Sequence, residues 1–405
     1  MNTRAKSVRC VFCGDAPVNH KLHYFNTASS LLPTLLFPPK TTSPKRFYQV
    51  TYSPLVRGLA RWLISLLWIL GAVRFSDEPG PTTTSRTKSV WKEAKKRGIR
   101  MQELVMFGLR REEMRALLPS KQGAKKLNWE YFNSIPVPPW KNQLGNGWID
   151  DKNTFKRMFQ KHDLPVARGA FVRSLAEAKK IFLDIGGRVI TKPREGSRAR
   201  HTTVAISNLR ELEEGFVRAK QLCPFVMVEE FIEGTLYRAT CVDRKLIGVV
   251  QFIKPATVAD GVHTVEELRV KHNAHKKFPQ LTDVQPDAWF TDAITHQGYT
   301  PETILPEGTP LLLSEHSERP NGGYFIDITD AIPEATRATI ERAAELCDVE
   351  VIGYDIISKD LTDAALRFTF IEGNTLPYIE LHDIPFEGTP RNVSGAVFDM
   401  WFPKP

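Results

Sequence analysis

The chain has 405 residues, 42% of them hydrophobic and 25% charged, so two or three compact domains with sizeable cores can form. Five cysteines, three of them widely scattered, exclude a disulfide scaffold and predict a reducing, cytoplasmic location. The net charge is +9, but residues 1–150 carry 24 basic and 9 acidic residues, whereas residues 151–405 carry 31 and 37. This excess indicates either an anionic partner of the N-terminal part or a solvated basic surface, and we favour the surface.

Residues 1–90 begin with a pattern of metal-binding residue types. Cys10, Cys13, His20 and His23 resemble a zinc-ligand spacing, but the six residues between the pairs are fewer than zinc fingers usually have. We therefore weigh a zinc site against a loosely ordered tail with incidental thiols, and favour the tail.

An apolar segment follows at Leu55–Phe75. Its uncharged centre, Trp62–Val73, spans only twelve residues, whereas a membrane span needs about twenty. Arginines flank it on both sides, so we favour a helix buried against the domain or lying at an interface. An anionic membrane surface is thus a candidate partner, and no specific nucleic acid is expected.

The next region, residues 91–150, is expected to be helical. Val90–Leu118 combines apolar residues with many charges, and Ile135–Pro139 ends the region as an extended segment. We therefore divide the chain into a basic N-terminal region (1–90), a helical region (91–150) and a third unit (151–405).

Residues 151–405 show mixed strand and helix signals, which predict an α+β fold. Asp150 or Asp151 can begin a helix, and capping boxes begin at Ser174 and Thr264. Further helices are predicted after Asn208, over Pro333–Cys347 and over Val393–Trp401. The predicted strands are Arg188–Pro193, Thr202–Ser207, Phe225–Phe231 and Tyr237–Val250, the last interrupted by a charged turn at Asp243–Lys245.

Two β-rich runs, Val349–Ile357 and Arg367–Ile371, are predicted to pair across the turn after Lys359. Pairing would bring Asp355 near Glu372 and Asn374. Two carboxylates and an amide form an oxygen cluster of the kind that Mg²⁺ prefers. These residues alone leave open whether Asp355 only interrupts a buried strand.

Three upstream features indicate a nucleotide. Lys152 lies at the start of a helix, Lys192 ends a strand, and the basic loop Arg194–His201 can wrap phosphates. Val228–Gly234 joins two strands through an apolar run that can contact an adenine. Each feature alone also fits an ordinary surface or interdomain strand.

In this order, the motifs resemble those of ATP-grasp ligases, above all the ATP-grasp module of cyanophycin synthetases, which glutathione-synthetase-type ligases share. The resemblance covers about residues 151–405. Besides the residues above, it rests on Glu229–Gly234, Asp260–Val265, Asn321–Thr329, Gly353–Asp355, Glu372–Asn374 and His382–Arg391.

This resemblance implies two α+β subdomains that grip ATP, and amide formation from a carboxylate and an amine through an acylphosphate. It implies an amino acid or small peptide as substrate, and one or two Mg²⁺ ions, or Mn²⁺, held by Asp355, Glu372 and Asn374. The implied ATP contacts are Lys152, Lys192, Gly196, Ser197, Glu229, Glu230, Phe231 and Ile232. The implied catalytic residues are Arg238, Lys192 and Arg200.

Several positions depart from the family pattern. Ala199 and His201 occupy two expected glycine positions in the phosphate loop, and Leu236 replaces a common acidic ribose contact. Ser314 and Glu318 stand where an arginine and an asparagine are expected, with Arg319 displaced. The departures affect the expected substrate more than the expected ATP site. They also motivate an alternative: an ATP-binding regulatory or scaffold protein with reduced catalysis.

The chain ends at Pro405 without the large C-terminal ligase domain of full cyanophycin synthetases, so we do not expect cyanophycin synthesis itself. The sequence leaves a homo-oligomer open.

Overall fold

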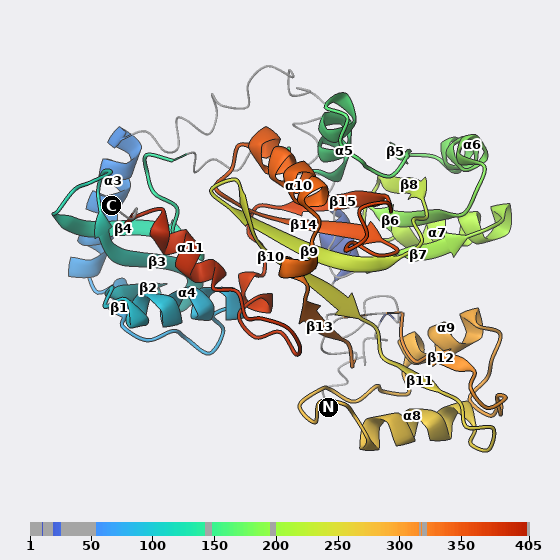
Figure 1. Ribbon diagram of the computed structural model, residues 1–405. Helices are drawn as coiled ribbons and strands as arrows, with labels where there is room; N and C mark the ends of the chain where they lie inside the picture. Colours follow the sequence, from blue (N-terminus) through green and yellow to red (C-terminus); the bar gives the residue numbers. More distant parts are fainter. Residues whose placement is uncertain are drawn as a thin grey trace, which may run out of the picture.

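The computed structural model describes residue 10, residues 19–25, 54–141, 148–194, 200–315, residue 317 and residues 322–402. These parts contain three larger β-sheets and a small two-stranded one, each flanked by helices (Figure 1). The mixture of antiparallel sheets and helices confirms the predicted α+β class.

The first sheet has four antiparallel strands in the order β1-β2-β3-β4. Helix α4 and the C-terminal helix α11 share a buried core with it. The elements are α3 (Pro54–Ile69), β1 (Val73–Ser76), α4 (Ser85–Lys96), β2 (Met101–Met106), β3 (Leu109–Pro119), β4 (Leu127–Asn133) and α11 (Val393–Asp399).

The helical character expected for Val90–Leu118 is wrong beyond Lys96. Phe107 and Gly108 adopt positive φ angles of 49° and 78° and turn β2 back into β3 as a tight hairpin. Alternate residues of β3 then enter the core, with Met114 and Ala116 fully buried. This period of two was hidden by the many charges, which resemble those of an exposed helix. The division at residue 90 stays a prediction, although β1 pairs with β2 across it.

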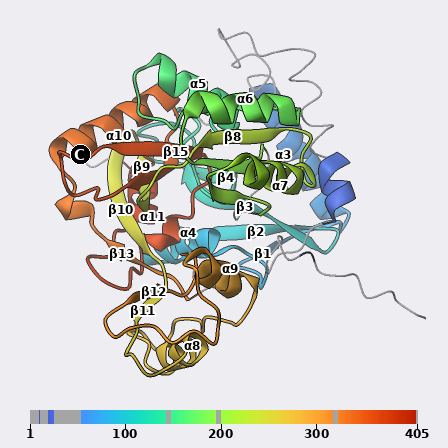
Figure 2. The same cartoon turned by 90° about the vertical axis from the view of Figure 1, so that its right-hand side faces the viewer.

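The second sheet, in the order β5-β8-β6-β7, lies at the other end of the molecule. Helices α6 and α7 cover its outer face, as the rotated view shows (Figure 2). The bounds are β5 (Gly169–Val172), α6 (Leu175–Ile185), β6 (Val189–Pro193), β7 (Thr203–Ile206), α7 (Leu209–Lys220) and β8 (Val226–Glu230).

The third sheet, in the order β13-β10-β9-β14-β15, is central. Helices α5 and α10 pack their apolar side chains against it. Its elements are α5 (Lys152–Lys161), β9 (Thr235–Val242), β10 (Lys245–Ile253), β13 (Tyr324–Asp327), η3 (Thr329–Ala331), α10 (Glu334–Cys347), β14 (Val351–Ser358), β15 (Phe368–Asn374) and η4 (Ile379–Leu381).

A smaller unit with its own apolar core lies beside the central sheet. It consists of β11 (Ala256–Val258), α8 (Val265–Ala274), α9 (Ala288–His296) and β12 (Pro310–Leu312). The predicted capping boxes at Ser174 and Thr264 are both present, as are the caps at Asp151 and Asn208.

Helix α3 presents an apolar face to solvent rather than to the protein. Five of its described side chains at helical spacing are each more than a third exposed: Leu59, Trp62, Leu63, Leu66 and Ile69. Among the described residues, no helix is long and apolar enough to cross a bilayer.

Candidate functional site

The candidate site is centred on the β14–β15 pair. The strands are antiparallel, with Asp355 opposite Glu372 and Gly353 opposite Asn374, which confirms the predicted pairing. A register shift follows directly after Asp355. Because side chains alternate along a strand, Glu372 and Asn374 share one face of β15. The three oxygen-bearing side chains therefore gather at one place.

A buried arginine lies next to this cluster. Arg238 on β9 is the register partner of Asp355, and its Nε donates to the Asp355 Oδ1 at 2.6 Å. Gly353 makes room for the arginine: a Cβ there would lie 3.2 Å from the Arg238 Cδ and 2.6 Å from the Pro377 Cβ. The guanidinium thus packs over a strand position where a side chain would crowd it.

Lys152, the first residue of helix α5, also contributes to the site. Asp151 caps the helix through the Thr154 N–H, and its other oxygen accepts from the Arg194 Nη2 at 2.5 Å. This pair ties the start of α5 to the end of β6. The Lys152 Nζ then lies 3.1 Å from the Glu372 Oε2.

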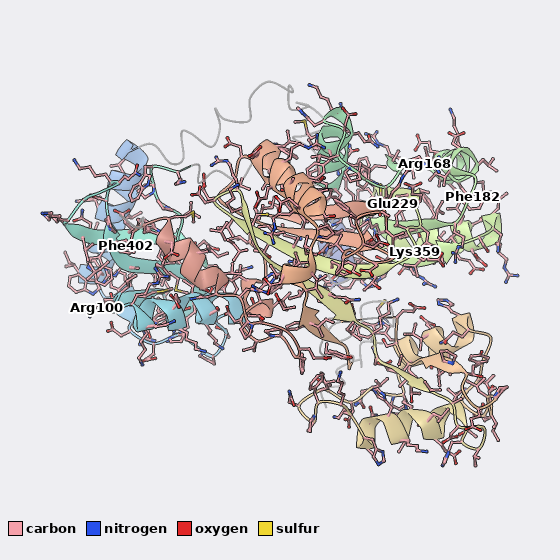
Figure 3. All side chains as sticks on the ribbon, viewed as in Figure 1. Arg100, Arg168, Phe182, Glu229, Lys359 and Phe402 are labelled. Atoms are coloured by element: carbon pink, nitrogen blue, oxygen red, sulfur yellow. The ribbon has the colours of Figure 1, made fainter. Side chains whose placement is uncertain are left out.

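Glu229 on β8 forms the second charged centre of the site. Its carboxylate is buried and paired with two lysines, Lys156 of α5 at 2.5 Å and Lys192 of β6. Figure 3 labels Glu229 where the second sheet approaches the central one. Because each carboxylate oxygen of Glu229 is paired with one lysine, Glu229 fixes the positions of both lysine side chains.

The pKa values show how strongly the carboxylates interact. Burial raises the pKa of Asp355 to about 6. The negative charge of Glu372 adds to this increase, whereas the positive charge of Arg238 opposes it. For Glu372 the effect of burial is outweighed by Lys152 and Lys192, and its pKa falls to about 2. Burial also opposes ionisation of Glu229, but Lys192 and Lys156 lower its pKa overall. Strongly perturbed pKa values of neighbouring carboxylates cluster at functional sites.

Two buried polar atoms in the site have no hydrogen-bond partner among the described residues: the Arg238 Nη1 and the Asn374 Nδ2. Buried donors without partners are costly and call for a ligand that accepts hydrogen bonds. The cations Lys152, Lys192 and Arg238 suit phosphate oxygens, and the oxygens of Asp355, Glu372 and Asn374 suit a hard divalent cation. The residues present therefore fit a nucleotide and its metal ion.

The remaining predicted residues are placed as follows. Glu230 turns toward Arg168, with 2.8 Å between the Oε2 and the Nε. The Phe231 ring lies under the Arg188 guanidinium at 4.8 Å, and the Phe231 N–H donates to the Arg188 carbonyl. Ile232, the second residue after β8, is half-buried. Arg200 precedes the buried His201, while Gly196 and Ser197 lie outside the described residues. Adenine contacts from this strand stay a prediction.

The sequence reasoning missed Lys156, Arg194 as the partner of Asp151, and the pairing of Glu229 with two lysines. A signal for Lys156 existed: it lies four residues after Lys152, so both project from one face of α5. The Arg194 and Glu229 pairs join residues 43 and 73 positions apart, and no local pattern encodes them.

No protein-family model matches the chain. Among curated proteins, the chain is similar to cyanophycin synthetase of a Nostoc species, with 28% identity over 335 residues. It is also similar to the bifunctional glutathione biosynthesis protein of Streptococcus thermophilus, with 26% identity over 275 residues. These alignments cover 78% and 63% of this chain, but only 35% of each relative.

Among solved structures, the chain is similar to a bifunctional glutathione synthetase from Pasteurella multocida. The TM-score is 0.52 at 21% identity, over 78% of this chain and 44% of that one. These likenesses confirm the resemblance to the ATP-grasp module of cyanophycin synthetase and the ATP-grasp fold expected from the motifs.

Proposed function

We propose that the chain is an ADP-forming ligase that joins a carboxylate to an amine through an acylphosphate. The supporting observation is the cluster of Asp355, Glu372 and Asn374 with Arg238 and Lys152, contributed by the central sheet and α5. Similarity to cyanophycin and glutathione synthetases supports amide formation and an amino acid or small peptide as substrate. The chain spans about a third of these relatives, so the activity is proposed for the part present here.

Each residue has a role in this proposal. Lys152 and Lys192 bind the phosphates of ATP, and Glu229 orients Lys192. Arg238 donates through its unpartnered Nη1 to the transferring phosphoryl group or the acylphosphate, where preorganised charge lowers the barrier most. Asp355, Glu372 and Asn374 hold the Mg²⁺ or Mn²⁺ ions. When bound, the ions neutralise charge on the phosphates.

The test is ADP release from ATP and Mg²⁺ in the presence of mixed amino acids and short peptides. We expect release that depends on an added substrate and that is lost in Asp355→Asn. The matched control is Asp363→Asn in the turn between β14 and β15, where the carboxylate accepts only a local backbone hydrogen bond. Release that Asp355→Asn leaves intact would contradict the proposed metal site.

One observation favours the alternative of an ATP-binding protein with reduced catalysis. His201 occupies an expected glycine position at the end of the phosphate loop and is almost completely buried. A loop held there by a packed side chain can close differently over the phosphates. Calorimetric ATP binding without any substrate-dependent ADP release would favour this alternative over the ligase.

We also propose that α3 binds the surface of an anionic membrane, with the remainder of the protein in the cytoplasm. The exposed apolar face of α3 and the ten basic residues among the first 76 support this, because lipid headgroups satisfy both. In sedimentation with anionic vesicles, Trp62→Gln should weaken binding. Leu183→Gln, at an equally exposed site on α6, should not. Equal binding by both variants and the wild type would refute the role of α3.

A further inference from the structure

Three metal-binding side chains meet at a place distant in sequence from the proposed nucleotide site. Cys10, His20 and His201 each offer one ligand atom, and these atoms all lie within 4.8 Å of one another. His20 begins a short helix over residues 20–25, whereas His201 follows the phosphate loop. The cluster therefore joins the N-terminal segment to the second sheet.

The geometry of the cluster suits a tetrahedral ion. The Cys10 Sγ lies 3.5 Å from the His201 Nε2. In a tetrahedral zinc site, a sulfur at about 2.3 Å and a nitrogen at about 2.0–2.1 Å from the ion are separated by about 3.5 Å. The His20 and His201 rings meet edge to face, with centroids 4.8 Å apart. A contraction of about 1.3 to 1.5 Å across the widest pair would bring all three ligands to zinc-binding distance.

A backbone contact fixes His201 in the form that binds a metal. Its Nδ1 lies 2.9 Å from the Arg218 carbonyl oxygen of α7, to which only a protonated nitrogen can donate. In the neutral ring the lone pair is then on the Nε2, which faces Cys10. Metal-binding histidines usually donate their second nitrogen to such a carbonyl.

The backbone at His201 supplies an independent argument. Its φ angle is 54°, in the left-handed region that glycine occupies without strain and a histidine less readily. This is also the position at which the ATP-grasp resemblance leads one to expect glycine. A buried histidine at a position suited to glycine indicates that the side chain has a specific role there.

His23 is not part of the cluster, whose closely spaced ligand atoms come from Cys10, His20 and His201. The His23 Nδ1 donates to the Leu222 carbonyl at 3.0 Å, so this ring anchors the short helix to the residue following the C-cap of α7. The zinc ligands suggested by sequence spacing included His23. The structure instead brings His201 to Cys10 and His20, and Cys13 lies outside the described residues.

We propose that Cys10, as a thiolate, and His20 and His201 bind one Zn²⁺ ion that fastens the N-terminal segment to the end of the phosphate loop. Cysteine and imidazole ligands select zinc over the hard ions that suit the oxygen cluster of the nucleotide site. On binding, the Cys10 thiol releases its proton to solvent, and a water or a fourth side chain completes the tetrahedron.

The test uses the full-length protein, purified without chelator and desalted, with its zinc content measured by plasma mass spectrometry. We expect about one zinc per chain. Cys10→Ser and His201→Gly should each lower the zinc content at least about tenfold. His23→Gln is the matched control from the same short helix and should keep the metal. With Co²⁺ in place of Zn²⁺, the sulfur-to-cobalt absorption band should be present in the control and absent in Cys10→Ser.

The His201→Gly variant is expected to remain folded, because glycine suits the positive φ angle at this position. Unfolding in urea is measured for each variant to confirm this. A wild-type protein that binds neither Zn²⁺ nor Co²⁺ would overturn the proposal and leave a hydrogen-bonded thiol–imidazole cluster. Metal retained by both Cys10→Ser and His201→Gly would also overturn it. None of these readouts requires ATP turnover, so the zinc site can fail or hold independently of the ligase.

Discussion

Replacing Asp355 by asparagine is expected to stabilise the metal-free protein at alkaline pH. Burial raises the pKa of this carboxyl from 3.8 to about 6, with Arg238 opposing the shift and Glu372 adding to it. Because the folded pKa lies above the unfolded one, the stabilising contribution of the bound proton is complete below pH 3.8 and is lost as the pH rises through about 6. The shift of about two units corresponds to about 3 kcal/mol of folding free energy. Asparagine cannot ionise and avoids this cost.

The assay is urea-induced unfolding with a chelator present, at pH 8 and at pH 5. The gain of Asp355→Asn over wild type should reach about 3 kcal/mol at pH 8 and fall to about half of that at pH 5, where the folded wild type has already taken up most of its proton. Asp363→Asn, the control in the same hairpin, should differ from wild type by about 0.5 kcal/mol or less at both values. A variant less stable than wild type at pH 8 would refute the reasoning and show that attraction to Arg238 outweighs burial.

Three further outcomes follow from the same contacts. Lys156→Met leaves the buried Glu229 with Lys192 alone and should destabilise the protein by about 3 kcal/mol in urea unfolding; adding Glu229→Gln should recover most of the loss, and no recovery would contradict the pairing. Arg238→Lys should lower substrate-dependent ADP release by about a hundredfold while calorimetric ATP binding persists; unchanged release would exclude Arg238 from the reaction. Gly248→Ala would place a Cβ 2.6 Å from the Nδ1 of the buried His382 and should cost about 2 kcal/mol in thermal unfolding, unlike a substitution at an open position.

The gathering of Asp355, Glu372 and Asn374 was predictable because its signals are local. The two runs around Asp355 and Glu372 are β-rich, and the turn between them is short enough to dictate an antiparallel pair. Helix caps at Asp151 and Asn208 were predictable for the same reason, since each cap involves residues only three positions apart. The likeness to known ligases then added the order of the distant motifs, which no local pattern provides.

The misjudged parts depend on long-range packing. The charges of β3 suggested an exposed helix, whereas pairing on both sides turned alternate residues into the core. The pattern of Cys10, Cys13, His20 and His23 fits either a zinc spacing or an incidental tail, and the sequence favours the tail. The fold instead brings His201 close to Cys10 and His20, from a position 191 residues away from Cys10. Sequence spacing can identify candidate ligands within one segment, but it cannot identify a candidate ligand that the fold brings in from a distant segment.

The ion pairs of the site indicate how nucleotide and metal binding depend on each other, if the proposed function holds. Lys152 is paired with Glu372, and Arg238 is paired with Asp355. A phosphate that draws Lys152 away leaves Glu372 a bare, buried carboxylate beside Asp355, and two such charges repel strongly. A divalent cation held by these carboxylates would remove that repulsion. Each ligand would therefore favour binding of the other, because each removes a charge imbalance that the other creates.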